Sequence, residues 1–340
     1  MEKVYFVKID SYLDTEKINL ATIKLLETIK PKFSGDIPLK VHFGEKGCST
    51  FIEPKNFNGL IDYLKKNNCN PFYIETNVLY KGQRTTKQNH IALAKEHGFK
   101  DLDIVIADGE MGEEFSEIEI NKKHFKNCKI GKKIAESSQM IVISHFKGHL
   151  LAGFGGAIKQ LGMGCAARGG KLDMHSNSKP IINPLVCKKC KTCVNSCPVD
   201  AINLSLIPTI DSKKCIGCAK CIAVCPFGAM KVNWVSTLPK TFNEKLAEYA
   251  FAATVHKKIL YINFLLNITK ECDCIGKDQK IIAKDIGVLM SYDPVAIDKA
   301  CFDILEKSEN KKLFSGDGIF NYSKEIGLGS TEYELEEIIL

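Results

Sequence analysis

The chain has 340 residues, of which 45% are hydrophobic and 26% charged, and this globular composition argues against an intrinsically disordered protein. Its formal net charge of +7 is not accompanied by a basic helix or by aromatic residues interleaved with basic ones, so we expect no nucleic-acid partner. The first residues lack the features of a signal peptide, and the longest apolar run, 259–268, is about half of the roughly 20 residues that span a bilayer. We therefore expect a cytoplasmic protein that does not enter a membrane.

Short β-rich runs alternate with longer amphipathic runs in the first half of the chain. This pattern predicts an α/β fold with a mostly parallel sheet and flanking helices. The predicted strands are 4–9, 38–43, 71–75, 103–107 and 140–144. The predicted helices, in which apolar residues recur at helical spacing, are 15–29, 54–66 and 85–96.

A group of basic and histidine side chains follows the last of these strands. Residues 145–175 contain three histidines, three lysines, one arginine and eight glycines. Ligands bind at the carboxyl ends of strands in α/β sheets, and glycines let the backbone approach them closely. We interpret this segment as a catalytic pocket for an anionic small-molecule substrate or a metal. The candidate residues are His145, Lys147, His149, Lys159, Arg168, Lys171 and His175, with the three lysines and the arginine as the anion contacts.

The alternative for this segment is a flexible glycine-rich loop whose charges only face water. A nicotinamide or flavin site gains no support, because Ile158 stands where a dinucleotide-binding fingerprint needs its third small residue. A phosphate-binding loop of the form G-x4-G-K-[ST] is absent from the sequence as well.

Fifteen cysteines are the most unusual feature of the composition. The cytosol keeps thiols reduced, and an odd count leaves one cysteine unpaired, so a disulfide framework is not expected. Metal binding is the leading explanation. Two oxidised four-iron clusters, each with a charge of about −2 including its thiolates, would lower the net charge to about +3.

Eight of these cysteines form a tandem repeat with an offset of 28 residues. Both copies have the form C-x2-C-x2-C-x3-C-P, in which three cysteines ligate one cluster and the fourth ligates the other. We assign Cys187, Cys190, Cys193 and Cys225 to one 4Fe–4S cluster and Cys215, Cys218, Cys221 and Cys197 to the second.

The repeat resembles the two-cluster bacterial ferredoxins. A segment this small cannot bury a stabilising core by itself, so bound clusters would supply much of its folding free energy. Two zinc sites or unpaired structural thiols are the alternatives, and the tight run of three cysteines disfavours them.

The pattern after the repeat is again that of an α/β fold. Residues 241–254 are predicted to form a helix, and 258–266 and 280–290 to form strands. With a linker at 177–180, we predict an α/β domain in residues 1–178 and 233–340, interrupted by an inserted ferredoxin-like α+β module at 179–232. A separate C-terminal domain is the alternative.

Two further cysteines, Cys272 and Cys274, are one residue apart, a spacing that suits a soft metal better than a disulfide. Completed by His145, His149 or His175, they would form a third metal centre. Incidental burial is the alternative, and it is the expectation for Cys48, Cys69, Cys128, Cys165 and Cys301.

Short segments along nearly the whole chain resemble the domain of unknown function 362 family of iron–sulfur centre proteins. These segments are 42–45, 76–80, 107–109, 145–175, 272–274, 285–287 and 293–298. The resemblance implies a large α/β domain that carries an inserted ferredoxin module. It does not imply a particular reaction.

Three functions agree with these features. The first is an iron–sulfur oxidoreductase, which receives electrons from a redox partner protein, a ferredoxin or a reductase. It would pass them through two 4Fe–4S clusters to a substrate or metal in the basic, histidine-rich segment. The second is a noncatalytic electron carrier, and the third is a redox- or metal-responsive binding protein. The basic segment favours the first, because a carrier needs no such pocket.

Overall fold

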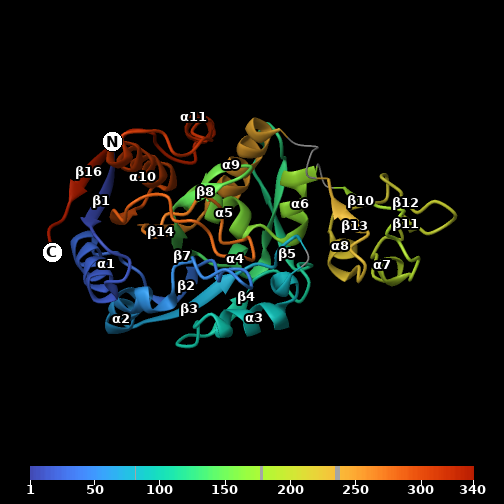
Figure 1. Cartoon of the computed structure of the whole chain (residues 1–340), viewed down its shortest axis with the longest axis horizontal. Helices are drawn as coiled ribbons and strands as arrows, with labels where there is room; N and C mark the ends of the chain where they lie inside the picture. The colour runs from blue at the N-terminus through green and yellow to red at the C-terminus, as the bar shows by residue number, and fades with distance from the viewer. Residues whose placement is uncertain (81, 177–178, 234–237) are drawn as a thin grey trace.

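The computed structural model describes residues 1–80, 82–176, 179–233 and 238–340. Its centre is an eight-stranded sheet with the strand order β16-β1-β15-β14-β7-β2-β3-β4 (Figure 1). β15 is antiparallel to both of its neighbours, and the other neighbouring pairs are parallel. The predicted α/β class with a mostly parallel sheet is therefore confirmed. The strands are β1 (Glu2–Lys8), β2 (Gly35–Lys40), β3 (Cys69–Glu75), β4 (Ile104–Ile106), β7 (Gln139–His145), β14 (Lys258–Leu265), β15 (Gly287–Ser291) and β16 (Tyr333–Glu337).

Helices cover both faces of this sheet. Figure 1 shows α1, α2 and α3 on one side, with α9 and α10 on the other. None of the described helices is long and apolar enough to cross a membrane. The helices outside residues 180–232 are α1 (Thr15–Ile29), α2 (Asn58–Lys66), α3 (Lys87–Glu96), α4 (Lys132–Ala135), α5 (Ala157–Cys165), α6 (Arg168–Ser176), α9 (Pro239–Thr254), α10 (Pro294–Glu309) and α11 (Gly318–Glu325), with 3-10 turns η1 (Pro54–Phe57) and η2 (Gln83–Thr85).

Alternation along the strands divides the apolar core into two layers. In β7, Ile141 packs in the layer with α1 and α2, whereas Met140 and Val142 pack in the layer with α5 and α9. Successive side chains of a strand point to opposite faces, so a strand covered by helices on both sides is apolar throughout. Two hairpins extend from this frame, β5 (Phe115–Glu119) with β6 (Asn127–Gly131) and β8 (Lys147–His149) with β9 (Gly153–Gly155).

Several predicted elements differ from the structure. The strand predicted for 280–290 is wrong in its first part, because the strand begins at Gly287. The carboxylate of Asp285 accepts hydrogen bonds from the backbone N–H groups of Asn267, at 2.6 Å, and Tyr12, at 2.7 Å, which keeps this stretch in a loop. The strand predicted for 38–43 is the earlier β2, which ends at Lys40. The helix predicted for 54–66 begins as η1 and continues as α2, and the one predicted from residue 85 begins at Lys87.

Residues 180–232 form small elements of their own beside α6, at the right of Figure 1. β10 (Pro180–Ile182) pairs with β13 (Met230–Val232) in an antiparallel ladder, so the two ends of the segment lie side by side. Residues 177 and 178 of the predicted linker lie outside the described residues. The remaining elements are α7 (Thr192–Asn195), β11 (Ile202–Asn203), β12 (Thr209–Ile210) and α8 (Lys220–Val224).

Candidate active-site cavity

A cavity of about 350 Å³ lies at the carboxyl ends of four neighbouring strands, β14, β7, β2 and β3. His42 and Thr76 follow β2 and β3, His145 ends β7, and Cys272 lies in the loop after β14. These four strands are parallel, so their ends meet at one edge of the sheet, which is where α/β proteins bind ligands. The volume lies in the range of about 300–1,000 Å³ that is typical of small-molecule pockets.

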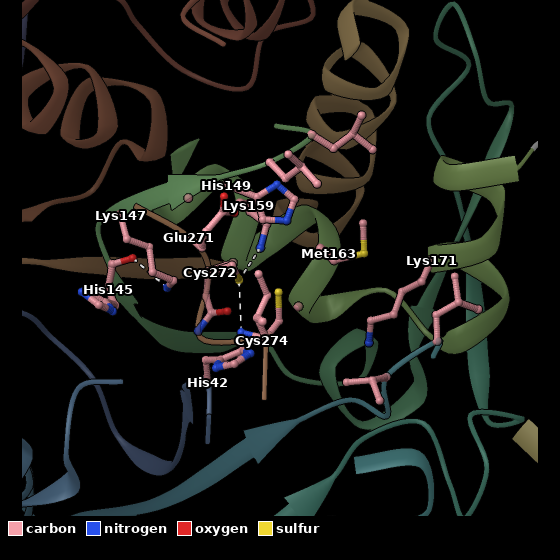
Figure 2. Close-up of a pocket in the computed structure, with 18 of the residues that line it drawn as sticks. His42, His145, Lys147, His149, Lys159, Met163, Lys171, Glu271, Cys272 and Cys274 are labelled. Atoms are coloured by element: carbon pink, nitrogen blue, oxygen red, sulfur yellow. Dashed lines mark hydrogen bonds between the residues drawn. The ribbon is translucent and has the colours of Figure 1, made fainter. Parts of the chain in front are cut away.

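Most of the predicted residues outside the cysteine repeat line this cavity (Figure 2). Arg168 is the exception, because its buried guanidinium donates hydrogen bonds to the backbone carbonyls of Val78, Met111 and Thr85. Arg168 therefore connects the loops that contain these three carbonyls, and it does not line the cavity. The residues that do line it are His145, Lys147, His149, Lys159, Lys171, His175, Cys272 and Cys274.

Asp273 joins two of the segments that form the cavity. Its buried carboxylate lies 2.8 Å from Lys147 Nζ and 3.1 Å from His145 Nδ1. Burial would raise the pKa of the Asp273 carboxyl, but Lys147 and His145 together hold this pKa well below its usual range. The Asp273 carboxylate therefore stays ionised and fixes the loop between the two cysteines to β8.

The sulfur atoms of Cys272 and Cys274 share a polar environment. Lys159 Nζ lies 3.5 Å from Cys272 Sγ, which also accepts a hydrogen bond of 3.4 Å from the backbone N–H of Cys274. The hydrogen bond from the Cys274 thiol lowers the pKa of Cys272 well below its ordinary value, and Lys159 and Lys147 lower it further against the effect of burial. The same hydrogen bond and burial raise the pKa of Cys274. Within the pair, the pKa of Cys272 is therefore lowered and that of Cys274 is raised.

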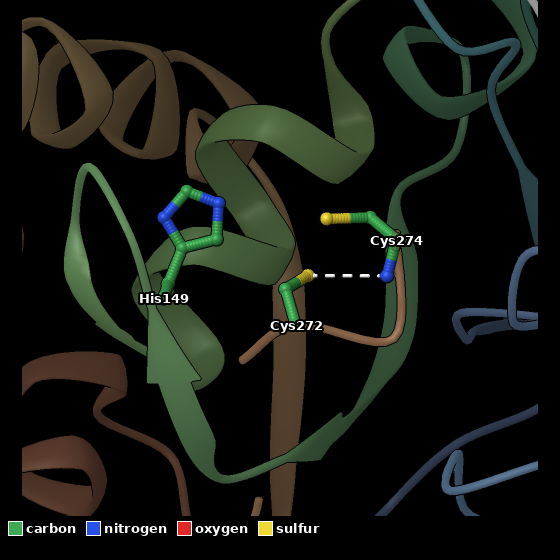
Figure 3. Close-up of side chains that lie close together, drawn as sticks. All are labelled: His149, Cys272 and Cys274. Carbon is green, nitrogen blue, oxygen red and sulfur yellow. Dashed lines mark hydrogen bonds between the residues drawn. The ribbon is translucent and has the colours of Figure 1, made fainter. Parts of the chain in front are cut away.

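His149 faces these two sulfur atoms (Figure 3). One donor atom from each of His149, Cys272 and Cys274 lies within 4.8 Å of the other two, and among the described residues this is the one such group of three histidine, cysteine or carboxylate donors. Burial holds the pKa of His149 well below its ordinary value, and the nearby lysines lower it further. The imidazole is therefore neutral. Burial likewise lowers the pKa of His175 to about 3.

Lys171 is a buried cation of the cavity that forms no ion pair with a described carboxylate. Its Nζ donates to Thr76 Oγ1 at 2.5 Å and to the carbonyl of Asn77 at 2.6 Å, and no carboxylate of the described residues lies within 4.0 Å. Burial lowers the pKa of Lys171 to about 8, while Asp108 and Glu75 oppose this shift. Glu75 itself is paired with the buried Lys40 at 2.9 Å. A largely protonated, buried ammonium group without an ion pair is a natural contact for an anionic ligand.

A second polar network lies in the cavity wall and was not predicted from the sequence. Arg84, which is 1% exposed, lies 2.9 Å from His42 Nε2, 3.1 Å from Glu45 Oε2 and 2.7 Å from the hydroxyl of Tyr80. Tyr80 in turn donates to the carbonyl of Cys274 at 2.9 Å. His42 and Tyr80 each follow a strand of the sheet within a few residues, so their position after β2 and β3 is the signal that would have found them.

The cysteine repeat places several of its thiols close together. Cys187, Cys190, Cys193 and Cys225, the set assigned to one cluster, line one small cavity. Burial raises the pKa of Cys193, and the neighbouring thiols of Cys225 and Cys187 raise it further. The fourth cysteine of each run accepts a hydrogen bond of 3.3 Å from the backbone N–H four residues later, Ala201 for Cys197 and Ala229 for Cys225.

Comparison with known families identifies the relationship of the chain. Residues 37–303 match the family described as Domain of unknown function (DUF362). The chain belongs to this family. The match includes the cavity residues that follow β2, β3, β7 and β14 as well as the cysteine repeat.

Two solved structures are similar to this DUF362 chain. A crystal structure of a protein from Thermotoga maritima, determined by a structural genomics consortium, has 12% sequence identity and a TM-score of 0.45 over 89% of this chain and 60% of that one. The lactate racemase apoprotein from Thermoanaerobacterium thermosaccharolyticum has 14% identity and a TM-score of 0.38 over 78% of this chain and 50% of that one. A search of curated proteins found no match.

Helix α6 connects the cavity of this DUF362 chain to its cysteine segment. Lys171 of α6 lines the cavity, whereas the next residue, Leu172, packs in a buried apolar cluster with cysteines of both runs. Leu79 both lines the cavity and belongs to that cluster. Gly169 lies against residues 217–218, where a Cβ would be 3.1 Å from the carbonyl oxygen of Gly217. The second cysteine run therefore packs directly behind the cavity wall.

Proposed function

We propose that this protein is an iron–sulfur oxidoreductase that transfers electrons from a partner protein, a ferredoxin or a reductase, to a substrate or metal in the α/β cavity. The observation that carries the proposal is the double contact of α6 and Leu79, which line the cavity on one side and pack among cluster-type cysteines on the other. A carrier that only binds its partners has no use for this arrangement.

The residues of the cysteine segment suit two 4Fe–4S clusters, which supply one-electron transfer when bound. The first set would be Cys187, Cys190, Cys193 and Cys225, and the second Cys215, Cys218, Cys221 and Cys197. The shared cavity of the first set supports this assignment, as do the matching N–H to sulfur hydrogen bonds at Cys197 and Cys225. Backbone N–H groups directed at sulfur stabilise thiolate ligands and help to set the cluster potential.

The second cysteine run would hold the cluster that is nearer to the substrate. Gly169 of α6 contacts this run at residues 217–218, and Arg168 has Cys218 as an electrostatic neighbour. The first run, which includes α7, lies farther from α6 than the second run does (Figure 1), and its Cys190 is exposed. We therefore assign electron delivery to the Cys218 side and contact with the partner protein to the Cys190 side.

The substrate that the cavity fits best is a small organic anion with an apolar body. Lys171 would bind the negative group, because its ammonium has no ion pair among the described side chains. Leu79, Met163 and Phe242 contribute apolar surface to the same cavity. A buried cation with an apolar wall favours such a ligand over an inorganic anion, which would leave the wall without contacts.

Anaerobic purification with iron, acid-labile sulfide and electron paramagnetic resonance measurements tests the clusters. We expect about eight irons and eight sulfides per chain. Binding of apolar carboxylates, with cinnamate and octanoate as probes in calorimetry, tests the cavity. Lys171→Met should abolish binding and leave the iron content unchanged, whereas Lys24→Met, on the exposed face of α1, should change neither. A colourless anaerobic preparation without sulfide would disprove the function.

A further inference from the structure

We propose that His149, Cys272 and Cys274 bind one divalent transition metal ion, with zinc as the ion that fits best, and that its fourth coordination position faces the cavity. The inference deepens the proposed function by naming the metal in the α/β cavity, and it rests on that function only for the link to the clusters. The three donor atoms already lie within 4.8 Å of one another in the wall of the cavity, where Cys272 is buried and His149 and Cys274 are partly buried.

The chain holds the histidine close to the cysteine loop by backbone contacts. The N–H of Gly148 donates to the carbonyl of Thr269 at 2.9 Å, and a Cβ on Gly148 would come within 2.0 Å of the carbonyl oxygen of Lys270. Only glycine permits this close approach of β8 to the loop. The approach places His149 beside Cys272.

The cysteine loop is anchored on its other side as well. The N–H of Ile275 donates to the carbonyl of Cys272 at 3.0 Å, and the N–H of Glu45 donates to the carbonyl of Asp273 at 3.0 Å. Tyr80 holds the carbonyl of Cys274 at 2.9 Å. These bonds, together with the ion pair of Asp273 and Lys147, fix both sulfur atoms toward the cavity before any ion binds.

Two sulfur donors and one imidazole are a recognised donor set for zinc. Sites with three protein ligands leave the fourth position of the tetrahedron for water or substrate, and the set of two cysteines and one histidine is among them. Thiolate and imidazole donors disfavour magnesium and calcium, which prefer oxygen ligands. The eight cysteines of the repeat lie in a different segment, so this centre does not compete with them for ligands.

Glu271, the residue before Cys272, gives a second, independent observation that favours a cation in this cavity. Its carboxylate oxygen Oε2 is buried and has no hydrogen-bond partner among the described residues, and the side chain lines the cavity next to Cys272 (Figure 2). A buried carboxylate oxygen without a partner is unfavourable, and a cation close to it removes that cost. The cation that now stands near Cys272 is the ammonium of Lys159, 3.5 Å from the sulfur. A metal ion would replace it as counter-ion and leave Lys159 to contact a negatively charged fourth ligand.

Zinc binding by the anaerobically purified, cluster-containing chain tests this inference. After treatment with a chelator and addition of zinc, elemental analysis of the desalted protein should find about one zinc per chain. X-ray absorption at the zinc edge, which iron does not disturb, should show sulfur neighbours at about 2.3 Å and a nitrogen neighbour at about 2.0–2.1 Å.

Variants separate this site from the rest of the protein. Cys272→Ser combined with Cys274→Ser should lose the zinc, and His149→Gln should weaken zinc binding, because it removes one of the three ligands. Iron, sulfide and the circular dichroism spectrum should not change in these variants. Cys69→Ser, which alters a buried cysteine at the amino end of β3, is the matched control and should retain the zinc.

The outcomes distinguish the two proposals. If the wild-type protein contains zinc but no iron or sulfide, the proposed electron-transfer function is contradicted, whereas the zinc site is still supported. Full iron and sulfide with no bound zinc, or with equal zinc in the wild type and in the double cysteine variant, would overturn the zinc site alone.

Discussion

The carboxylate of Asp273 lies 2.8 Å from the ammonium nitrogen of Lys147, and both side chains are buried. Asp273 separates the two cysteines of the loop after β14, whereas Lys147 begins β8, the strand that ends at His149. This ion pair therefore joins the two segments that carry the proposed metal donors.

Asp273→Asn should be strongly destabilising, because it leaves the ammonium of Lys147 buried without its counter-ion. Removal of one partner of a buried pair costs about 3–5 kcal/mol in free energy of unfolding. Chemical denaturation of the cluster-containing protein measures this loss. The exposed pair of Lys3 and Glu336 is the control, and Glu336→Gln should cost less than about 1 kcal/mol. Equal effects at the two sites would contradict the role assigned to Asp273.

The same carboxylate has a defined effect on the pH dependence of stability. The pKa of Asp273 is lower in the folded protein than in the unfolded chain, where it is about 3.9. Its contribution is thus fully present above pH 4 and is lost as the pH falls toward the folded-state pKa. Acid titration of the wild type and Asp273→Asn should therefore give stability curves that converge only below about pH 4. Curves that converge near neutral pH would show that another group is responsible.

We expect the affinity for an anionic ligand to fall at alkaline pH, where Lys171 loses its proton. Burial lowers the pKa of Lys171 to about 8, and only the protonated ammonium attracts an anion. The affinity for an apolar carboxylate should be constant below pH 7 and fall by about tenfold per pH unit well above pH 8. Calorimetry across this range measures the effect. Lys171→Met should bind weakly at every pH, and a wild-type affinity that does not change up to pH 10 would place the anion elsewhere.

Gly148→Ala should damage both stability and metal binding, because its Cβ would lie 2.0 Å from the carbonyl oxygen of Lys270 and force β8 away from the cysteine loop. Overpacking of this kind typically costs about 1–3 kcal/mol. Zinc affinity should fall with it, since His149 moves away from Cys272. Gly318→Ala, where a Cβ meets no atom within 4 Å, is the matched control and should be neutral or slightly stabilising in thermal unfolding.

Cysteine substitutions test the interlocked cluster ligands. If the fourth cysteine of each run serves the other cluster, Cys193→Ser and Cys225→Ser should remove the same cluster and leave about four irons per chain. Cys197→Ser should instead impair the cluster of the second run. Electron paramagnetic resonance of the reduced variants distinguishes the two centres. Identical spectra for Cys225→Ser and Cys221→Ser would show that the fourth cysteine belongs to its own run.

Local sequence patterns determined the class of the fold. The alternation of β-rich and amphipathic runs predicted β1, β2, β3, β4, β7 and β14 but not β16, which pairs in parallel with β1, and α1 has its predicted bounds, Thr15–Ile29. These elements follow from contacts between near neighbours in sequence, which a periodic pattern records. The strand predicted for 280–290 was wrong at its start because Asp285 bonds to Tyr12, which is 273 residues away. No local pattern contains that contact.

Only some of the residues that line the cavity could be predicted from the sequence. The dense group at 145–175 and the pair at 272 and 274 stand out by composition, whereas His42, Tyr80 and Arg84 are single polar residues, of which His42 and Tyr80 lie in segments that carried the family resemblance without being assigned to the site. Arg168 has the same composition signal as Lys171, yet its guanidinium binds backbone carbonyls behind the cavity wall. Side chains three residues apart on α6 thus have different roles, and the sequence contains no sign of which is which.

The sequence by itself determined the α/β class and the cysteine spacing from which a pair of clusters is proposed, because both depend on residues that are close together along the chain. The tertiary structure alone decided that His149 meets Cys272 and that α6 stands between the cavity and the cysteine segment. The physical reason is that parallel strands far apart in sequence end at the same edge of the sheet, where their loops must share one space.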